Sequence, residues 1–247
     1  MAATTEKSTI VLITGANQGI GFEIAKKLGK DHANYHIIMA GRRKEAIEEA
    51  VKNLQSLGCS VEPLVMDITS DEAIAQGAAA VDEIHGRLDV LINNAGISTE
   101  GDTPTREAWR QDMETNVIST NKVTDAFIPL LRKSTVPCKR IVFVSTSLAS
   151  MGDKLNRNDQ YHKVDWRIYR SSKAAFNMLA ASYIVDFEDD PTWKINIHDP
   201  GYCGTNLNGF KGFDTPENGA LNACRLATLG PGGETGTFSN RHGPVAW

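Results

Sequence analysis

The chain has 247 residues, of which 41% are hydrophobic and 23% are charged, so it can bury a substantial core within one α/β domain. Its net charge of −4 excludes the large basic patch that DNA or RNA binding usually requires, and its four cysteines and six histidines show no metal-ligand spacing, so neither nucleic acid nor a metal is expected as a partner. No apolar stretch approaches about 18 residues and the N-terminus is polar, which predicts a soluble, cytoplasmic protein without a membrane span.

Short apolar strands and amphipathic helices are predicted to alternate along the chain. Strands are expected at residues 10–13, 36–40, 61–66, 88–92, 140–144 and 194–198. Helices are expected at residues 20–29, 45–57, 69–86, 106–133 and 169–187. Because each crossover is right-handed and packs back on the sheet, this alternation forms a parallel sheet covered on both faces. The sequence therefore predicts a single doubly wound α/β domain of the Rossmann type, spanning residues 1–247.

Several helix ends carry local signals. Gly29, Gly58 and Gly86 follow the last apolar residue of their helices, where glycine commonly ends a helix. Thr69 and Glu72 have the spacing of a capping box, which predicts the start of the helix that follows the third strand.

The glycine-rich run Thr14–Gly21 lies between the first strand and the first helix. Glycine lets the backbone approach a ligand closely, and a helix N-terminus offers free N–H groups and partial positive charge, a combination that suits a pyrophosphate. The three residues between Gly15 and Gly19 make the spacing looser than the usual dinucleotide fingerprint, so an ordinary tight turn is the alternative. The predicted cofactor residues of this run are Gly15, Asn17, Gln18, Gly19, Ile20 and Gly21.

The residues after the second strand indicate which cofactor binds. In NAD-binding folds an acidic residue near this point binds the ribose hydroxyls, whereas a 2′-phosphate favours arginine. Here the strand is followed by Arg42 and Arg43, and the first carboxylate is Glu45. NADP(H) is therefore the expected cofactor, with Arg42 as its phosphate ligand and Arg43 on the surface.

Tyr169 and Lys173 are four residues apart on one predicted helix face. A free tyrosine loses its proton near pH 10. Acid–base catalysis near pH 7 therefore requires the tyrosine pKa to fall by about three units, which corresponds to roughly 4 kcal/mol. A nearby ammonium favours the phenolate and supplies part of that shift. No other tyrosine of the chain has a lysine four residues later, which favours a catalytic pair over a chance pairing on a helix face.

These motifs together resemble the short-chain dehydrogenases/reductases, and most closely their carbonyl-reductase-like branch. The resemblance rests on the glycine run, the segment Asn93–Gly96, Asn116, the segment Tyr169–Lys173, and Pro200-Gly201 with Thr205, in the family's usual order over nearly the whole chain. It implies further cofactor contacts in addition to Tyr169 and Lys173, namely Asp67 at the adenine, Asn94, Ala95, Gly96, Pro200, Gly201 and Thr205.

The resemblance also implies the remaining catalytic residues. Asn116 would bend its helix and hold a water in a proton relay to Lys173. The family places a carbonyl-polarising serine after the fifth strand, and alignment on Val144-Ser145 puts Thr146 at that position. A threonine hydroxyl donates the same hydrogen bond, although a shift of one residue would present Ser147 instead. Thr146 is the favoured candidate.

Two segments are candidates for the substrate side of the site. The polar stretch 151–167 is longer than the family's by around ten residues and is either a lid or a solvated surface loop. Residues 202–215 contain three glycines with Phe210 and Phe213 between them, which suits a mobile substrate loop, or else these rings pack on the core. The long helices 106–133 and 169–187 resemble the family's subunit contacts and imply a homodimer or homotetramer.

The expected function is an NADPH-dependent reductase of a ketone or aldehyde, with Tyr169 as the proton donor. An imine or enone reductase and an alcohol dehydrogenase of the same family are alternatives. A cofactor-binding regulator without turnover is an alternative of a different class, and the threonine at position 146 is its only support.

Overall fold

The computed structural model describes residues 8–99 and 104–247, which fold around one sheet. The strand order is β3-β2-β1-β4-β5-β6-β7-β8, and all neighbours are parallel except the β7–β8 pair. The strands are β1 Thr9–Thr14, β2 Tyr35–Gly41, β3 Val61–Val65, β4 Val90–Asn93, β5 Lys139–Val144, β6 Trp193–His198, β7 Phe238–Asn240 and β8 Gly243–Pro244.

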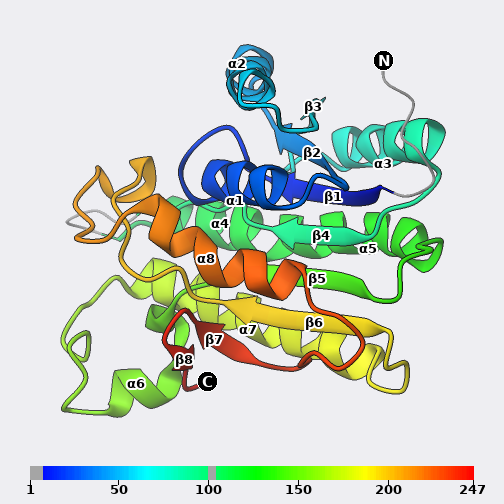
Figure 1. Ribbon diagram of the computed structural model, residues 1–247. Helices are drawn as coiled ribbons and strands as arrows, with labels where there is room; N and C mark the ends of the chain where they lie inside the picture. Colours follow the sequence, from blue (N-terminus) through cyan, green and yellow to red (C-terminus); the bar gives the residue numbers. More distant parts are fainter. Residues whose placement is uncertain (1–7, 100–103) are drawn as a thin grey trace.

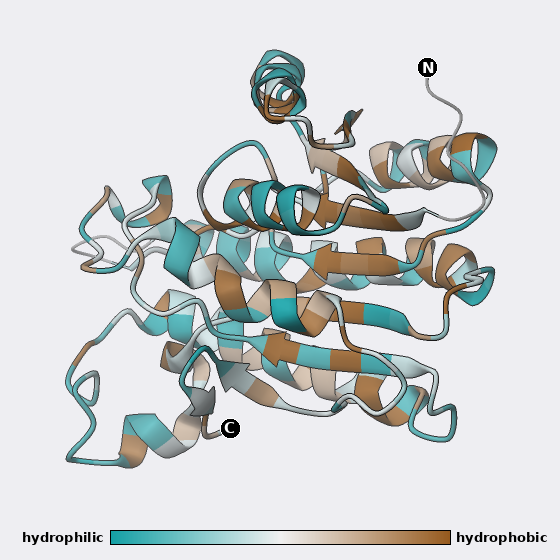
Figure 2. Ribbon diagram, viewed as in Figure 1, coloured by the Kyte–Doolittle hydropathy of each residue, from teal (hydrophilic) through white to brown (hydrophobic). Residues whose placement is uncertain are grey.

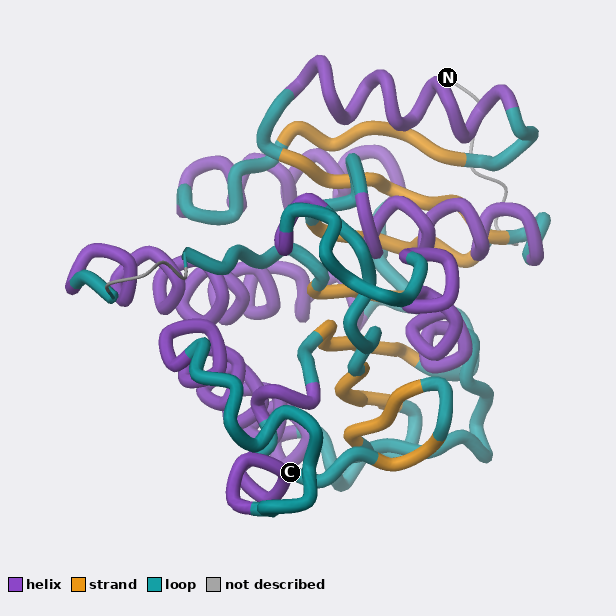
Figure 3. The backbone as a smooth tube through the Cα atoms, turned by 90° about the vertical axis from the view of Figure 1, so that its left-hand side faces the viewer, coloured by secondary structure: helices purple, strands orange, loops and turns teal. Residues whose placement is uncertain are grey.

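Helices cover both faces of this sheet (Figures 1 and 3). Apolar residues of α1, α2 and α8 pack on one face, and those of α3, α5 and α7 pack on the other. The helices are α1 Gly19–Asp31, α2 Lys44–Ser56, α3 Asp71–His85, α4 Arg106–Met113, α5 Ser119–Arg132, α6 Met151–Leu155, α7 Arg167–Asp186 and α8 Pro216–Ala227. The predicted doubly wound fold and its six main strands are confirmed. Within the described ranges, no helix combines the length and apolar character needed to cross a bilayer.

The central strands are buried along their whole length because helices cover both of their faces. Every residue of β1, β4 and β6 is buried, and β1 and β4 are mainly brown in Figure 2. Buried rings of Phe127, Phe143 and Phe176 fill the layer between the sheet and α5 and α7. This packing fixes the carboxyl ends of the strands along one edge, to the left in Figure 1.

Two of the predicted helix-end signals are wrong. Gly29 lies inside α1, where a Cβ atom would come within 2.8 Å of Cys59 Cβ, so this glycine serves helix packing. Ser70 is the N-cap of α3 and accepts a hydrogen bond from the Ala73 N–H at 3.2 Å. Thr69 does not cap the helix, because its N–H and hydroxyl both donate to Asp67 Oδ1. Gly58 and Gly86 do follow helix ends, with φ of +81° and +69°.

Candidate active site

A cavity of about 1020 Å³ opens at the carboxyl ends of the central strands. It is lined by nearly all of the residues singled out from the sequence, which come from segments far apart along the chain. Gly21 and Asn116 are the two exceptions, and both are buried directly behind the wall. The predicted residues that line it are Gly15, Asn17, Gln18, Gly19, Ile20, Arg42, Asp67, Asn94, Ala95, Gly96, Thr146, Ser147, Tyr169, Lys173, Pro200, Gly201 and Thr205.

The glycine turn is held in place by the segment that follows β4. Gly15 and Gly19 have φ of +64° and +59°, a conformation that favours glycine. Asn94 Nδ2 donates to the carbonyls of Thr14 and Gly15 at 2.8 and 3.1 Å, and the backbone N–H groups of Asn94 and Ala95 donate to Thr14 Oγ1. The turn and the Asn94 segment therefore form one rigid unit.

Within this unit, Gly21 packs closely against Asn94 and Gly15, so there is no room for a side chain at this position. A Cβ atom there would lie 2.4 Å from Asn94 Nδ2 and 2.7 Å from the Gly15 carbonyl oxygen. We expect Gly21→Ala to displace the Asn94 amide and to destabilise the protein by about 2 kcal/mol or more, lowering the melting temperature by roughly 4–8 °C. Differential scanning calorimetry measures this change. The matched control is Gly230→Ala, because a Cβ atom at Gly230 meets no heavy atom within 4 Å. Equal melting temperatures for the two variants would contradict the prediction.

Arg42 and Asp67 line the cavity where β2 and β3 end. Arg42 directly follows β2, and its side chain is exposed. Arg43 is the N-cap of α2 and is not among the described residues that line the cavity. Asp67 Oδ1 accepts hydrogen bonds from the N–H and the hydroxyl of Thr69 at 3.0 and 2.8 Å, which fixes its carboxylate.

Tyr169 and Lys173 lie on the cavity side of α7, and both are almost completely buried. Lys173 Nζ donates to the Val144 carbonyl at 2.9 Å and lies 4.2 Å from the centre of the Phe176 ring. Burial lowers the pKa of Lys173 to about 8, and the nearby Asp112 carboxylate partly opposes that change. Burial also raises the pKa of Tyr169, and the Asp199 and Asp112 carboxylates raise it further. Burial and these two carboxylates therefore act against the shift toward the phenolate that the sequence leads us to expect from the ammonium.

Asn116 lies in a π-helical turn, Glu114–Ile118, between α4 and α5. The wider turn interrupts the helix, as expected for this residue, and such turns are frequent at functional sites. Its side chain exchanges hydrogen bonds with the Ile97 backbone, at 2.8 and 2.9 Å, and donates to Ser172 Oγ at 3.0 Å. A Cβ atom at Gly96 would lie 3.1 Å from Asn116 Oδ1 and 3.4 Å from Lys173 Nζ. Asn116 Oδ1 and Lys173 Nζ therefore both lie beside Gly96.

Thr146 and Ser147 both line the cavity, but their hydroxyls are used differently. Thr146 is the N-cap of a short 3₁₀ turn, Ser147–Ala149, and its Oγ1 accepts from the Leu148 N–H at 3.2 Å. This bond leaves the Thr146 hydroxyl proton available to a ligand. Ser147 lies beside the buried Asp199 carboxylate, where its N–H and hydroxyl oppose the rise in the pKa of that carboxyl.

The segment 151–167 forms a folded wall of the cavity. Lys154 Nζ donates to the carbonyls of His162 and Val164 at 3.0 and 2.9 Å, which closes this segment on itself. Tyr161 and Trp166 line the cavity. Trp166 has φ of +35°, a sparsely populated conformation that places its ring edge-on to Tyr169, 6.3 Å between ring centres. The segment therefore contributes directly to the site.

The segment 202–215 reaches across the cavity to the glycine turn. Asn206 Nδ2 donates to Gln18 Oε1 at 2.6 Å, and Tyr202 packs edge-on to Trp166 at 6.5 Å. Phe210 and Phe213 are 69% and 77% exposed, so these rings do not pack on the core.

Two carboxylates of the site carry no sequence signal strong enough to predict them. Asp199 is buried beside Ser147 and Tyr169, and burial raises its pKa although hydrogen bonds from Gly201 and Ser147 oppose the shift. Asp112 is fully buried and accepts from the N–H and the hydroxyl of Thr99 at 3.0 and 2.7 Å. The one sequence feature that could have pointed to Asp199 is its position directly before Pro200, which is itself a predicted site residue.

The cavity fits a dinucleotide. Gly15 and Gly19 line the cavity without side chains at the start of α1, so the backbone there can approach a ligand closely. Arg42 lies at the end of the cavity near β2, and Tyr169 and Lys173 lie on α7. This donor set accommodates a phosphate at one end and a reacting group at the other.

Comparisons with known proteins agree with this geometry. The profile of the short chain dehydrogenase family matches residues 9–214. The chain is 41% identical over 235 residues to the short-chain dehydrogenase anuI of Penicillium roqueforti, covering 93% of this chain and 92% of that protein. It is 35% identical over 218 residues to the short-chain dehydrogenase/reductase eupG of a Phoma species, covering 80% and 78% of the two chains. The NADPH-bound carbonyl reductase from chicken fatty liver has a similar structure, with a TM-score of 0.82, 25% identity, and coverage of 98% and 100%.

Proposed function

The chain belongs to the short-chain dehydrogenase/reductase family, and we propose that it is an NADPH-dependent reductase of a ketone or aldehyde. One observation carries this proposal. The glycine cradle, Tyr169, Lys173 and Thr146 all line the same cavity, so a nucleotide and a carbonyl compound can bind side by side.

Each side chain then has a chemical task. The cofactor, when bound, supplies a hydride for the carbonyl carbon. Thr146 donates its free hydroxyl proton in a hydrogen bond to the carbonyl oxygen and so polarises the bond. Tyr169 transfers its phenolic proton to that oxygen as negative charge develops, and the ammonium of Lys173 stabilises the phenolate that remains. A Tyr169 pKa raised by burial keeps the tyrosine in its donor form, and an alkoxide is a strong enough base to take the proton.

Apolar and aromatic side chains in the cavity wall suit an apolar substrate. Beyond the catalytic groups the lining includes Leu148, Tyr161, Trp166, Tyr202 and Leu207, together with the polar side chains Glu107, Arg110, Gln111 and Glu114. Aromatic and aliphatic walls bind apolar molecules through the surface that they remove from water. A reductase of menthone from Mentha piperita, 25% identical with a TM-score of 0.76, supports the assignment of an apolar ketone.

Arg42 supports NADP(H) over NAD(H). Its exposed guanidinium lines the cavity directly after β2, where an acid would serve NAD(H). The carbonyl reductase from chicken fatty liver, a structural neighbour of this chain, has NADPH bound and so also supports NADP(H).

We expect Arg42→Asp to weaken NADPH binding by about 10–100-fold, because the change removes a charged hydrogen bond to the 2′-phosphate and adds repulsion. Isothermal titration with NADPH and with NADH measures both dissociation constants. Arg43→Asp is the matched control, since it makes the same charge change at a side chain that does not line the cavity. Equal or tighter NADH binding by the unmodified protein would overturn the assignment.

The function itself is tested with a panel of ketones and aldehydes, in which NADPH oxidation is followed by absorbance. Apolar ketones should be reduced fastest. If the protein binds NADPH but reduces no member of a broad panel, the reductase proposal fails and a regulator without turnover takes its place.

Assembly into a homodimer or homotetramer stays a prediction from the family resemblance. Met178 and Val185 lie one above the other on α7 and are 66% and 60% exposed. These two exposed apolar side chains lie on one of the helices from which the family resemblance implies subunit contacts.

A further inference from the structure

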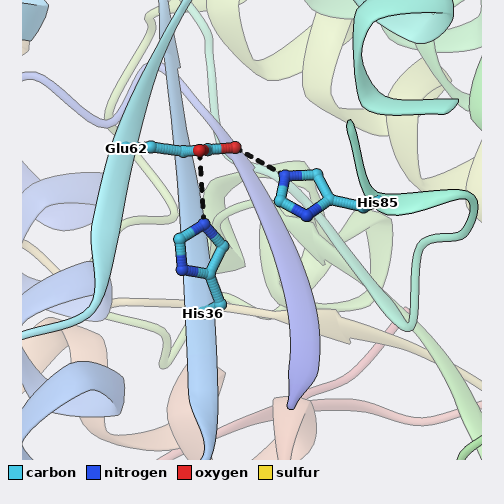
Figure 4. Close-up of side chains that lie close together, drawn as sticks. All are labelled: His36, Glu62 and His85. Carbon is cyan, nitrogen blue, oxygen red and sulfur yellow. Dashed lines mark hydrogen bonds and ion pairs between the residues drawn. The ribbon is translucent and has the colours of Figure 1, made fainter. Parts of the chain in front are cut away.

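Three metal-ligating side chains meet at the opposite end of the sheet from the cavity. His36 comes from β2, Glu62 from β3 and His85 from the last turn of α3 (Figure 4). Their ligating atoms all lie within 4.8 Å of one another. His85 Nε2 lies 2.6 Å from Glu62 Oε1, and His36 Nε2 lies 3.4 Å from Glu62 Oε2. The three residues are called the His36 cluster below.

The strand register brings these residues together. Ile38 lies opposite Glu62 in the parallel β2–β3 pair, and residues two apart on a strand share a face. His36 and Glu62 therefore point to the same side of the sheet as Ile38, which packs with Ile74 and Val81 of α3. Because α3 covers this side, its final residue His85 completes the cluster.

The cluster is polar, yet it is largely removed from water. The side chain of His85 is 1% exposed, that of His36 is 14% exposed and that of Glu62 is 31% exposed. His36 Nδ1 is hydrogen-bonded to Ser60 Oγ at 2.8 Å, so Nε2 is the nitrogen directed at Glu62. This Nε2 is buried and forms no aligned hydrogen bond with any residue in the described part of the chain. A buried nitrogen of this kind is an open ligand position.

We propose that His36, Glu62 and His85 form a zinc-binding site. Two imidazoles and one carboxylate are a known set of protein ligands for Zn²⁺, with a water in the fourth position. Bonds of about 2.0–2.1 Å in a tetrahedral site place neighbouring ligand atoms roughly 3.3 Å apart, close to the distance between His36 Nε2 and Glu62 Oε2. The shorter contact between His85 and Glu62 has to open for the metal to bind, and protons are released where a ligand nitrogen carried one.

Two further features of the cluster suit metal binding: Ser60 contacts the His36 ring, and Glu62 is partly exposed to solvent. Ser60 orients the His36 ring from behind, the role that hydrogen-bond partners of metal ligands commonly have. The partly exposed Glu62 leaves an entry path and room for a water ligand. None of the three ligands lines the nucleotide cavity, so the ion would join β2, β3 and α3 and take no part in the reaction.

The test uses the full chain, first stripped with a chelator and then titrated with ZnCl₂ in a calorimeter. We expect one Zn²⁺ per chain, release of protons, and a higher melting temperature in the presence of Zn²⁺. Glu62→Gln and His85→Ala should each weaken binding by at least about 100-fold, and Ser60→Ala by about 10-fold. His242→Gln, which removes an exposed histidine outside the cluster, is the matched control and should bind zinc like the parent.

Glu62→Gln keeps the shape of the side chain, so it separates loss of the ligand from loss of folding. Its NADPH affinity should equal that of the parent, which distinguishes failure of this proposal from failure of the proposed reductase function. X-ray absorption of the zinc-loaded protein should show two imidazole ligands and a carboxylate. If the parent binds no zinc beyond the level of Glu62→Gln, or if all variants bind it equally, the cluster is only an ion-pair network and the proposal is wrong.

Discussion

Tyr169→Phe should lower the turnover number for carbonyl reduction by about 10³-fold or more and leave the NADPH dissociation constant within about twofold of the parent. The substitution removes only the hydroxyl that supplies the proton. The ring stays buried against Trp166, so the fold and the cavity wall are kept. Steady-state kinetics on a substrate from the carbonyl panel, together with calorimetric NADPH titration, measure the two quantities separately.

Tyr202→Phe is the matched control for this experiment. Tyr202 also lines the cavity, but the proposed mechanism does not use its hydroxyl, so its loss should change turnover only a few-fold. Lys173→Ala should both slow turnover and weaken NADPH binding, since the family's lysine also reaches the nicotinamide ribose. If Tyr169→Phe kept turnover within a few-fold of the parent, the proton would have to come from another group and the proposed mechanism would fail.

Thr146→Ala should reduce turnover by about 10²-fold with little change in cofactor affinity, because it removes one hydrogen bond to the developing oxyanion. The structure supports this choice, since the Thr146 hydroxyl accepts from Leu148 and keeps its proton free. Thr146→Ser should restore most of the activity, because serine donates the same hydrogen bond. The measurement is the turnover number at saturating NADPH.

Ser147→Ala is the natural comparison. Its hydroxyl lies beside the buried Asp199 carboxylate, so we expect a lower melting temperature and a smaller loss of turnover than for Thr146→Ala. The reverse order, with Ser147→Ala the inactive variant and Thr146→Ala near normal, would show that Ser147 polarises the carbonyl.

The sequence by itself determines the features that depend on neighbouring residues. Apolar periodicity predicts the alternating strands and helices, and these dictate the parallel sheet and the edge where ligands bind. The glycine turn after β1, the arginine after β2, and the spacing of Tyr169 and Lys173 are all local patterns. A local signal fails where two polar residues compete for one role, as Thr69 and Ser70 do at the start of α3.

Only the tertiary structure decides how distant side chains pair and how deeply they are buried. It raises the pKa of Tyr169, because burial and the Asp199 and Asp112 carboxylates act on a group that the sequence places only beside a lysine. It places Ser147 beside the buried Asp199 carboxylate and leaves the hydroxyl proton of Thr146 available to a ligand. It also assembles the His36 cluster from two strands and a helix end, which no spacing along the chain predicts. Hydrogen bonds and desolvation depend on distances in space, and strand order, register and helix packing fix those distances.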